Sequence, residues 1–217
     1  MNRHTLNLRP ANPTIDEGLV CARHLDETAE GFFGVMLGRR VAEILAQAYI
    51  EPSHSYSYEN VLFAEQNGHI IGMALSFTAA QYRAFTDRPL KRAAGFPALR
   101  MRTVQLLTRP MLQVLKTIAD GDFYLLSIGI DEDQRGKGVG SALMDAVEER
   151  ARAAGSKRLS LDVAAKNEGA RRLYERRGMT VASQWPKRLP LAGIRLYRMT
   201  KTLTPRQAEP SASSTIF

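Results

Sequence analysis

A glycine-rich segment in the second half of the chain is the part of the sequence best suited to chemistry. It lies between an apolar run and a segment with helical periodicity. Glycines let a backbone approach a ligand closely, and the first N–H groups of a helix have no partners within it and lie at its positive end. Together they form a cradle for a pyrophosphate group. The predicted cradle consists of Arg135, Gly136, Lys137, Gly138, Val139, Gly140 and Ser141.

Three phosphate-binding patterns can be compared with this segment. The P-loop pattern fails because Lys137 is followed by glycine rather than by Ser or Thr. The dinucleotide fingerprint fails because Ser141 stands where its third glycine belongs. The pattern that fits is Arg-x-x-Gly-x-Gly, formed by Arg135, Gly138 and Gly140.

The hydrophobic pattern predicts the elements that must position this turn. Alternating or apolar runs predict strands over residues 5–9, 61–66, 69–77, 123–130, 157–164, 180–183 and 194–201. Helical periodicity predicts helices over residues 16–28, 32–49 and 141–154, and a short one after Asn167 that ends at Gly178. Asn67-Gly68 predicts a tight hairpin turn. We therefore expect an α/β fold with a mixed central sheet of about seven strands flanked by helices.

Residues 81–119 interrupt the pattern of predicted strands and are expected to form an amphipathic helical insertion. Residues 81–118 carry eight basic side chains against a single acid, Asp87. Such a segment suits an anionic partner or forms a solvated basic face. Nucleic acid is not expected, since no nucleic-acid-binding motif accompanies the charge. The insertion is either a lid over the substrate or an interface in a homodimer.

Length and composition limit the remaining possibilities. The chain has 217 residues, 44% hydrophobic, with a net charge of +8. We expect one domain over residues 1–203 and a disordered tail over residues 204–217, which are rich in Pro, Ser and Ala. The chain has no apolar run long enough for a spanning helix, and its first ten residues lack the apolar core of a secretory signal. The expectation is a cytoplasmic protein without membrane contact.

Cysteine and histidine usage argues against several kinds of site. The lone Cys21 excludes an intrachain disulfide and is expected to be a small buried residue rather than a nucleophile. The four histidines lie in separate segments without metal-ligand spacing, so no metal site is predicted.

Two motifs in the second half resemble those of the GNAT N-acetyltransferase superfamily. The first is the apolar strand that ends at Ile130 followed by the Arg-x-x-Gly-x-Gly turn, although Glu132 replaces a proline often found there. The second matches Asn-x-x-Ala-x-x-Leu-Tyr-x-x-x-Gly-Phe and consists of Asn167, Ala170, Leu173, Tyr174, Gly178 and, in place of the aromatic, Met179. The resemblance is strong over residues 123–180. It implies an acyl-CoA-binding GNAT-like fold with acetyl-CoA as cosubstrate.

The resemblance also implies roles for particular residues. The backbone of Ile128, Gly129 and Ile130 would pair with the pantetheine arm, and a backbone N–H near Ile130 would stabilise the oxyanion. Residues 135–141 would hold the pyrophosphate. Asn167 matches a position that hydrogen-bonds the cofactor, and it is equally suited to capping the helix that follows.

Two side chains are candidates for proton transfer. Tyr174 matches the tyrosine that often protonates the departing thiolate, and its alternative is a core tyrosine on a helix. Asp162 matches a carboxylate that relays a proton through water, and its alternative is an ion pair with a nearby arginine. Together these residues predict an N-acetyltransferase for a primary amine of a small-molecule or amino-acid-like acceptor. A protein or peptide amine acetyltransferase and a non-catalytic acyl-CoA sensor are the alternatives.

Overall fold

The computed structural model describes residues 6–95, 101–104, 106, 117–186 and 195–204. The strands, in chain order, are β1 (Asn7–Pro10), β2 (Val61–Gln66), β3 (His69–Thr78), β4 (Asp122–Ile130), β5 (Arg158–Ala164), β6 (Thr180–Trp185) and β7 (Leu196–Thr202). The α-helices are α1 (Ile15–Thr28), α2 (Phe32–Leu37), α3 (Val41–Tyr49), α4 (Ala79–Ala84), α5 (Arg88–Ala94), α8 (Val139–Ala153) and α9 (Glu168–Arg176). Short 3-10 turns occupy Gly38–Arg40, Tyr58–Asn60 and Glu132–Gln134.

The strands form one mixed sheet of seven, in the order β1-β2-β3-β4-β5-β7-β6. All neighbouring strands are antiparallel except β4 and β5, which are parallel. The chain between β4 and β5 contains α8, as a parallel crossover requires. The predicted α/β fold with a mixed seven-stranded sheet is confirmed.

The predicted hairpin between β2 and β3 is confirmed by the backbone conformation of its turn. Asn67 and Gly68 both have positive φ, 52° and 77°, the conformation that a two-residue hairpin turn of this kind requires. Side chains then alternate between the two faces of the sheet. Phe63 and Met73 pack into one hydrophobic cluster, and Ala64 and Ala74 into the other.

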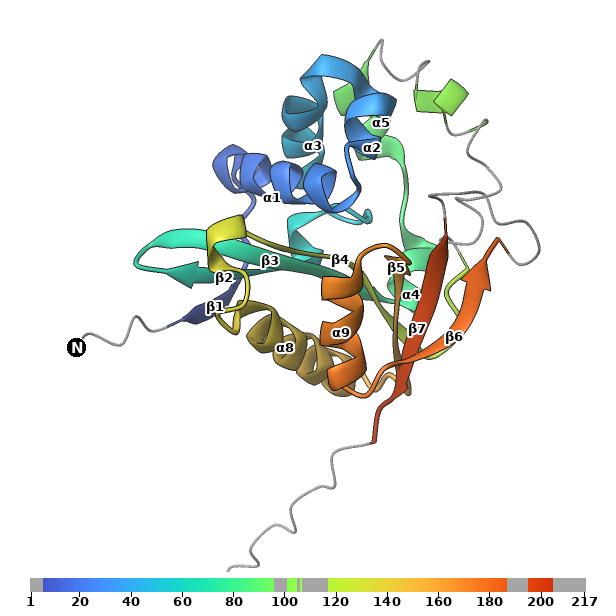
Figure 1. Cartoon of the computed structure of the whole chain (residues 1–217). Helices are drawn as coiled ribbons and strands as arrows, with labels where there is room; N and C mark the ends of the chain where they lie inside the picture. The colour runs from blue at the N-terminus through green and yellow to red at the C-terminus, as the bar shows by residue number, and fades with distance from the viewer. Residues whose placement is uncertain (1–5, 96–100, 105, 107–116, 187–194, 205–217) are drawn as a thin grey trace, which may run out of the picture.

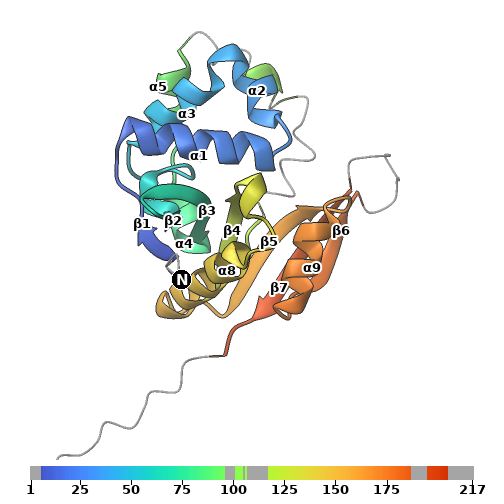
Figure 2. The ribbon, with the colours of Figure 1, turned by 60° about the vertical axis from the view of Figure 1, so that its left-hand side comes forward.

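Two helical layers cover the sheet (Figures 1 and 2). α1, α2, α3 and α5 lie over one face, which we call the α1 face, and α8 and α9 lie over the other, the α8 face. Each layer encloses its own hydrophobic cluster, with Phe77 and Tyr124 on the α1 face and Leu125 and Tyr174 on the α8 face. The sheet therefore has one core on each side, and β4 contributes to both.

The predicted helix over residues 32–49 is interrupted in the structure. α2 ends at Leu37, where Gly38 has a φ of 78°, and α3 begins at Val41 after a 3-10 turn. A positive φ cannot continue an α-helix, and glycine adopts it without steric cost. Apolar periodicity runs through the break because both helices face the same core.

Other expectations for the chain meet the structure only in part. The predicted insertion begins within α4, which starts at Ala79, and contains α5, while much of its remainder lies outside the described residues, so its role as lid or interface stays a prediction. The predicted tail lies outside them beyond Thr204. No helix in the described ranges has the length and apolar character needed to span a bilayer. Cys21 is 1% exposed, and burial raises the pKa of its thiol to about 12, as expected for a structural residue.

Candidate active site

The most unusual feature of the sheet is the separation of its two parallel strands. β4 and β5 pair only from Asp122–Arg158 to Leu125–Leu161, although β4 continues to Ile130. At this point β4 also carries a bulge, because Leu126 has no partner on β3 while the residues on either side of it do. Bulges bend a strand and end its pairing. The backbone edge of β4 beyond Leu125 therefore faces β5 without a β5 partner.

The three predicted cofactor-strand residues lie on this separated part of β4. Ile128 and Ile130 pack with the cluster on the α8 face. Gly129 lies below α1, where a Cβ would come within 2.9 Å of the Cβ and Nδ1 atoms of His24. His24 is fully buried. Glycine is thus required at residue 129 because α1 approaches the strand so closely.

Replacing Gly129 by alanine is expected to lower the free energy of unfolding by about 1–3 kcal/mol, the usual cost of overpacking a core. The added methyl group would push against His24 and separate α1 from β4. Urea denaturation measures the change. Gly169→Ala in α9 is the matched control, since the nearest atom to its Cβ would be 3.9 Å away and a helix favours alanine. A Gly129→Ala variant as stable as the parent would show that α1 does not rest on this strand.

The glycine-rich turn leads from the end of β4 into α8. Gly136 and Gly138 have positive φ, 77° and 90°, and Gly138 is the N-cap residue of α8 without any side-chain cap. The N–H groups of the first helical turn are therefore left for a ligand, at the positive end of a 15-residue helix. Arg135 folds back so that its Nε donates to the Ile130 carbonyl at 3.3 Å. The predicted phosphate cradle is thus placed directly beside the separated end of β4.

Gly140 and Arg177 bring α8 and α9 together behind the cradle. A Cβ on Gly140 would lie 2.9 Å from Ile130 Cδ1 and 3.2 Å from Leu173 Cδ2, so this glycine lets α8 approach both β4 and α9. The Arg177 guanidinium donates to the Ser141 carbonyl at 2.7 Å. Val139 is buried and packs into the α8-face cluster. These contacts hold the first turn of α8 in place.

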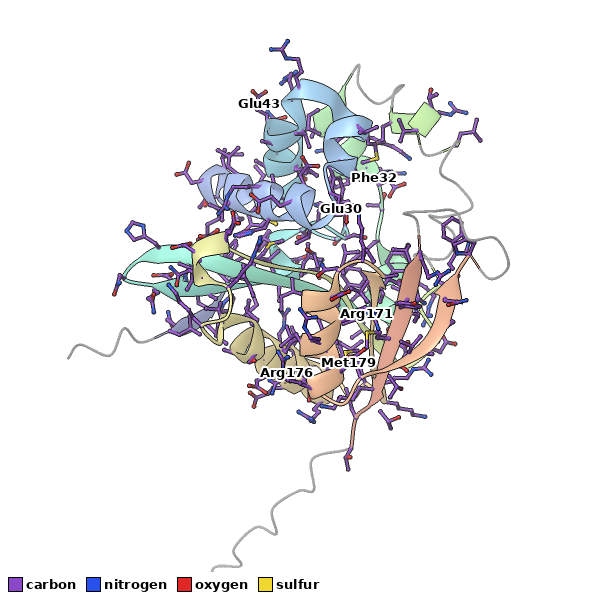
Figure 3. The ribbon with its side chains drawn as sticks, viewed as in Figure 1. Glu30, Phe32, Glu43, Arg171, Arg176 and Met179 are labelled. Carbon is purple, nitrogen blue, oxygen red and sulfur yellow. The ribbon has the colours of Figure 1, made fainter. Side chains whose placement is uncertain are left out.

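Asn167 caps α9 in the structure. Its Oδ1 accepts a hydrogen bond from the Ala170 N–H at 3.0 Å, which is one of the two roles expected of it. Lys166, the preceding residue, forms an ion pair with Glu30 at 2.6 Å. Figure 3 shows Glu30 at the end of α1 and Arg171 on α9, the two helices that this pair connects. The end of α1 is therefore linked to the start of α9.

Tyr174 is buried on α9, 5% exposed, in the same hydrophobic cluster as Ile128 and Ile130. Burial raises the pKa of its hydroxyl above the ordinary value for tyrosine. The group therefore stays protonated at every physiological pH and can serve as a proton donor. The Met179 that replaces the family's aromatic residue is buried in the same cluster.

Asp162 is the residue of β5 that follows its last pair with β4. Its Oδ1 accepts from Arg198 Nε at 2.9 Å, and its Oδ2 accepts from Arg198 Nη2 at 2.6 Å and from the Tyr124 hydroxyl at 2.8 Å. Its side chain is 4% exposed and that of Arg198 13%. Burial and the Asp162 charge raise the pKa of Tyr124 well above its ordinary value. Asp162 thus forms the arginine ion pair that was one of the two roles considered for it.

Sequence reasoning missed three residues of this region: Tyr124, Arg198 and His24. Tyr124 and Arg198 reach Asp162 through strand pairing, since Asp162 lies opposite Arg198 in the β5–β7 register. The alternation of β7 was visible, but its register against β5 was not. For His24, the only signal was a glycine within a strand, which indicates a close approach without naming the partner.

The separated strands, the uncapped helix and the glycine-rich turn define an enzyme of the acyltransferase class. A model of the acetyltransferase (GNAT) family matches residues 25–179, well over half of the chain. The chain belongs to the GNAT family, as the sequence motifs predicted, and is an N-acetyltransferase. No curated protein matches the chain.

Solved structures agree with this assignment. The crystal structure of an acetyltransferase is similar with a TM-score of 0.63 and 25% identity, covering 91% of this chain and all of that one. An N-acetyltransferase from Staphylococcus aureus Mu50 has a TM-score of 0.62 and 16% identity, over 90% of this chain and all of its own. The ribosomal-protein-S18-alanine N-acetyltransferase from Escherichia coli has a TM-score of 0.51 and 16% identity, over 95% and 98%. The last two support the fold alone.

Proposed function

We propose that this enzyme transfers the acetyl group of acetyl-CoA to a primary amine of a small-molecule or amino-acid-like acceptor, by direct attack of the amine. The observation that carries the proposal is the stretch of β4 from Leu126 to Ile130, which has no partner on β5 and ends at the cradle before α8. Family members generally use acetyl-CoA, and the residues here fit such a ligand. A backbone edge suits the amide-bearing arm and an uncapped helix suits the pyrophosphate.

Each predicted residue then has a task. The backbone of Ile128, Gly129 and Ile130 holds the arm as an added strand and offers an N–H to the oxyanion. The N–H groups of Gly136 and of residues 138–141 face the pyrophosphate, while that of Lys137 donates to the Gln134 carbonyl. The exposed side chains of Arg135 and Lys137 add positive charge. Asn167 caps α9 and directly follows Lys166, whose ion pair with Glu30 connects it to the end of α1. The side-chain amide of Asn167 contributes a hydrogen bond to the same ligand.

Tyr174 serves as the general acid. The amine nitrogen forms a bond to the thioester carbonyl carbon, the carbon–sulfur bond breaks, and the thiolate takes the proton of the Tyr174 hydroxyl. A phenol is protonated at neutral pH, so its hydroxyl has a proton to give to the sulfur as the carbon–sulfur bond breaks. The nitrogen loses one proton as it becomes an amide, and that proton returns through water to Tyr174.

Release of free CoA thiol from acetyl-CoA tests the proposal. We expect release that depends on one class of amine in a panel of amines, amino acids, polyamines and short peptides. Release with protein or peptide amines alone would favour the alternative protein acetyltransferase. Calorimetric binding of acetyl-CoA without turnover of any amine would favour a sensor. Failure to bind acetyl-CoA would contradict the proposed function.

A further inference from the structure

Two hydroxyl groups meet on the α1 face of the separated stretch of β4. Ser127 lies on this stretch, directly after the bulge, and is 9% exposed. Its Oγ lies 2.8 Å from the Oγ1 of Thr28, in the last turn of α1. Thr28 is exposed although its hydroxyl contacts the strand, so solvent reaches this side of β4. An incoming molecule can therefore approach the hydroxyl pair.

The other hydrogen bonds of Thr28 indicate which hydroxyl donates. The Thr28 hydroxyl has one proton, which it donates to the His24 carbonyl at 2.8 Å, with the Leu25 carbonyl as a second acceptor at 3.1 Å. A carbonyl oxygen can only accept, whereas a serine hydroxyl can donate and accept. With the Thr28 proton on these carbonyls, Ser127 donates its own proton to Thr28. The Ser127 oxygen then has lone pairs left to accept a hydrogen bond from a ligand.

The two sides of this stretch offer different groups to a bound thioester. Ile128, Ile130 and Tyr174 belong to the cluster on the α8 face, where Tyr174 is buried. Ser127 meets α1 on the opposite face. An arm that pairs with the edge of β4 lies in the plane of the sheet, between these two sets of groups. The proton donor to sulfur is therefore on one side, and the accepting oxygen of Ser127 is on the other.

The end of α1 favours positive charge at this place. The carbonyl end of a helix carries a partial negative charge, and the last turn of this 14-residue helix contains no basic side chain. An amine nitrogen becomes positively charged as it bonds to the thioester carbon. A hydrogen bond from its N–H to Ser127 strengthens as that charge develops, and an interaction that is stronger in the transition state accelerates the reaction.

We propose that Ser127 binds the acceptor amine by accepting a hydrogen bond from its N–H, and that Thr28 positions the Ser127 hydroxyl for this role. The proposal rests on the proposed function and names the residues of the same site that receive the amine. Ser127 takes no proton from the nitrogen. It holds the nitrogen on the α1 side of β4, so that the nitrogen lone pair faces the thioester carbon. Thr28 acts through Ser127 and is a positioning residue.

Steady-state kinetics of three variants of the full chain tests the proposal. The acceptor is whichever of ethanolamine, spermidine, Nα-acetyl-lysine amide and triglycine gives the parent its highest kcat/KM. Ser127→Ala should lower kcat/KM for this amine about 10–100-fold, the usual effect of losing one hydrogen bond to a charged group. The Kd of acetyl-CoA, measured by calorimetry, should not change. Thr28→Val keeps the branched shape without the hydroxyl and should cause a smaller fall, whereas Thr28→Ser keeps the hydroxyl and should retain the parent value.

Ser76→Ala is the matched control. Ser76 on β3 is 1% exposed, and its hydroxyl has no hydrogen-bond partner among the described residues. Its neighbours Leu75 and Phe77 pack into the α1-face cluster, so Ser76 points to the other face. This variant should keep the parent kcat/KM. Urea denaturation checks the fold of every variant, and Ser127→Ala should remain folded because Thr28 still donates within its own helix.

Several results would overturn the inference and leave the proposed function intact. One is a Ser127→Ala variant with the parent kcat/KM for the amine, and another is an equal fall in Ser76→Ala. Full activity in Thr28→Val beside a loss in Thr28→Ser would show that residue 28 acts through packing alone. A raised Kd for acetyl-CoA in Ser127→Ala would assign the hydroxyl to the cofactor instead. If the parent releases no CoA with any amine, the proposed function fails as well, so the two failures are distinguishable.

Discussion

Replacing Tyr174 by phenylalanine should lower kcat by about 10²–10⁴, the usual effect of removing a positioned general acid. The KM for acetyl-CoA should change little, because in the proposed mechanism the hydroxyl acts on the departing sulfur and not on the bound ground state. Phenylalanine keeps the ring that fills the buried cluster on the α8 face. Steady-state kinetics with CoA thiol detection measures both constants.

The pH dependence and a second tyrosine provide controls for this variant. Burial raises the pKa of Tyr174, so the required protonated form persists throughout the range up to the ordinary tyrosine pKa of about 10, and activity should not decline there on its account. Tyr56→Phe removes a phenol from the cluster on the α1 face and should leave kcat unchanged. A Tyr174→Phe variant with the parent kcat would show that another group protonates the thiolate.

Replacing Arg198 by methionine should lower the free energy of unfolding by about 3–5 kcal/mol, the usual cost of removing one partner of a buried ion pair. Asp162, 4% exposed, would keep its charge without its counter-ion, and among the described residues the Tyr124 hydroxyl alone would still donate to it. Urea denaturation measures the loss. An unchanged slope of the unfolding free energy against urea concentration would show that the same cooperative unit unfolds.

A surface pair and a double variant separate this effect from a general loss of charge. Arg172 lies 3.1 Å from Glu168 on α9, with side chains 61% and 72% exposed, and Arg172→Met should cost no more than about 0.5 kcal/mol. Adding Asp162→Leu to Arg198→Met should restore much of the stability, because no unpaired charge remains. A loss below about 1 kcal/mol in Arg198→Met alone would contradict the buried pair.

Local sequence signals predicted those parts of the fold that depend on local rules. Asn67-Gly68 formed the expected hairpin turn. Gly155, with a φ of 68°, follows the end of α8, where helices commonly end with a left-handed glycine. Gly38 broke a helix that apolar periodicity had continued through, because periodicity reports which face is buried and not whether the backbone is continuous. The strand boundaries differed from the predicted ones by at most two residues.

The candidate site was less accessible to sequence reasoning because its contacts join distant segments. The Asp162–Arg198 pair depends on the β5–β7 register, and the contact of Gly129 with His24 depends on how α1 packs on the sheet. Neither can be derived from spacing along the chain. The motif residues of the cradle were accessible, since a turn and the helix that follows it are positioned by local geometry.

The separation of β4 from β5 also bears on how this protein has been able to diverge. A ligand that pairs with backbone N–H and carbonyl groups is largely indifferent to which side chains project above and below the strand. Substitutions on β4 are then limited more by side-chain packing than by ligand recognition, as long as residue 129, where α1 approaches the strand, remains glycine. Such a site can persist while the rest of the sequence drifts, which agrees with a fold matched at TM-scores of 0.63 and 0.62 by chains of only 25% and 16% identity.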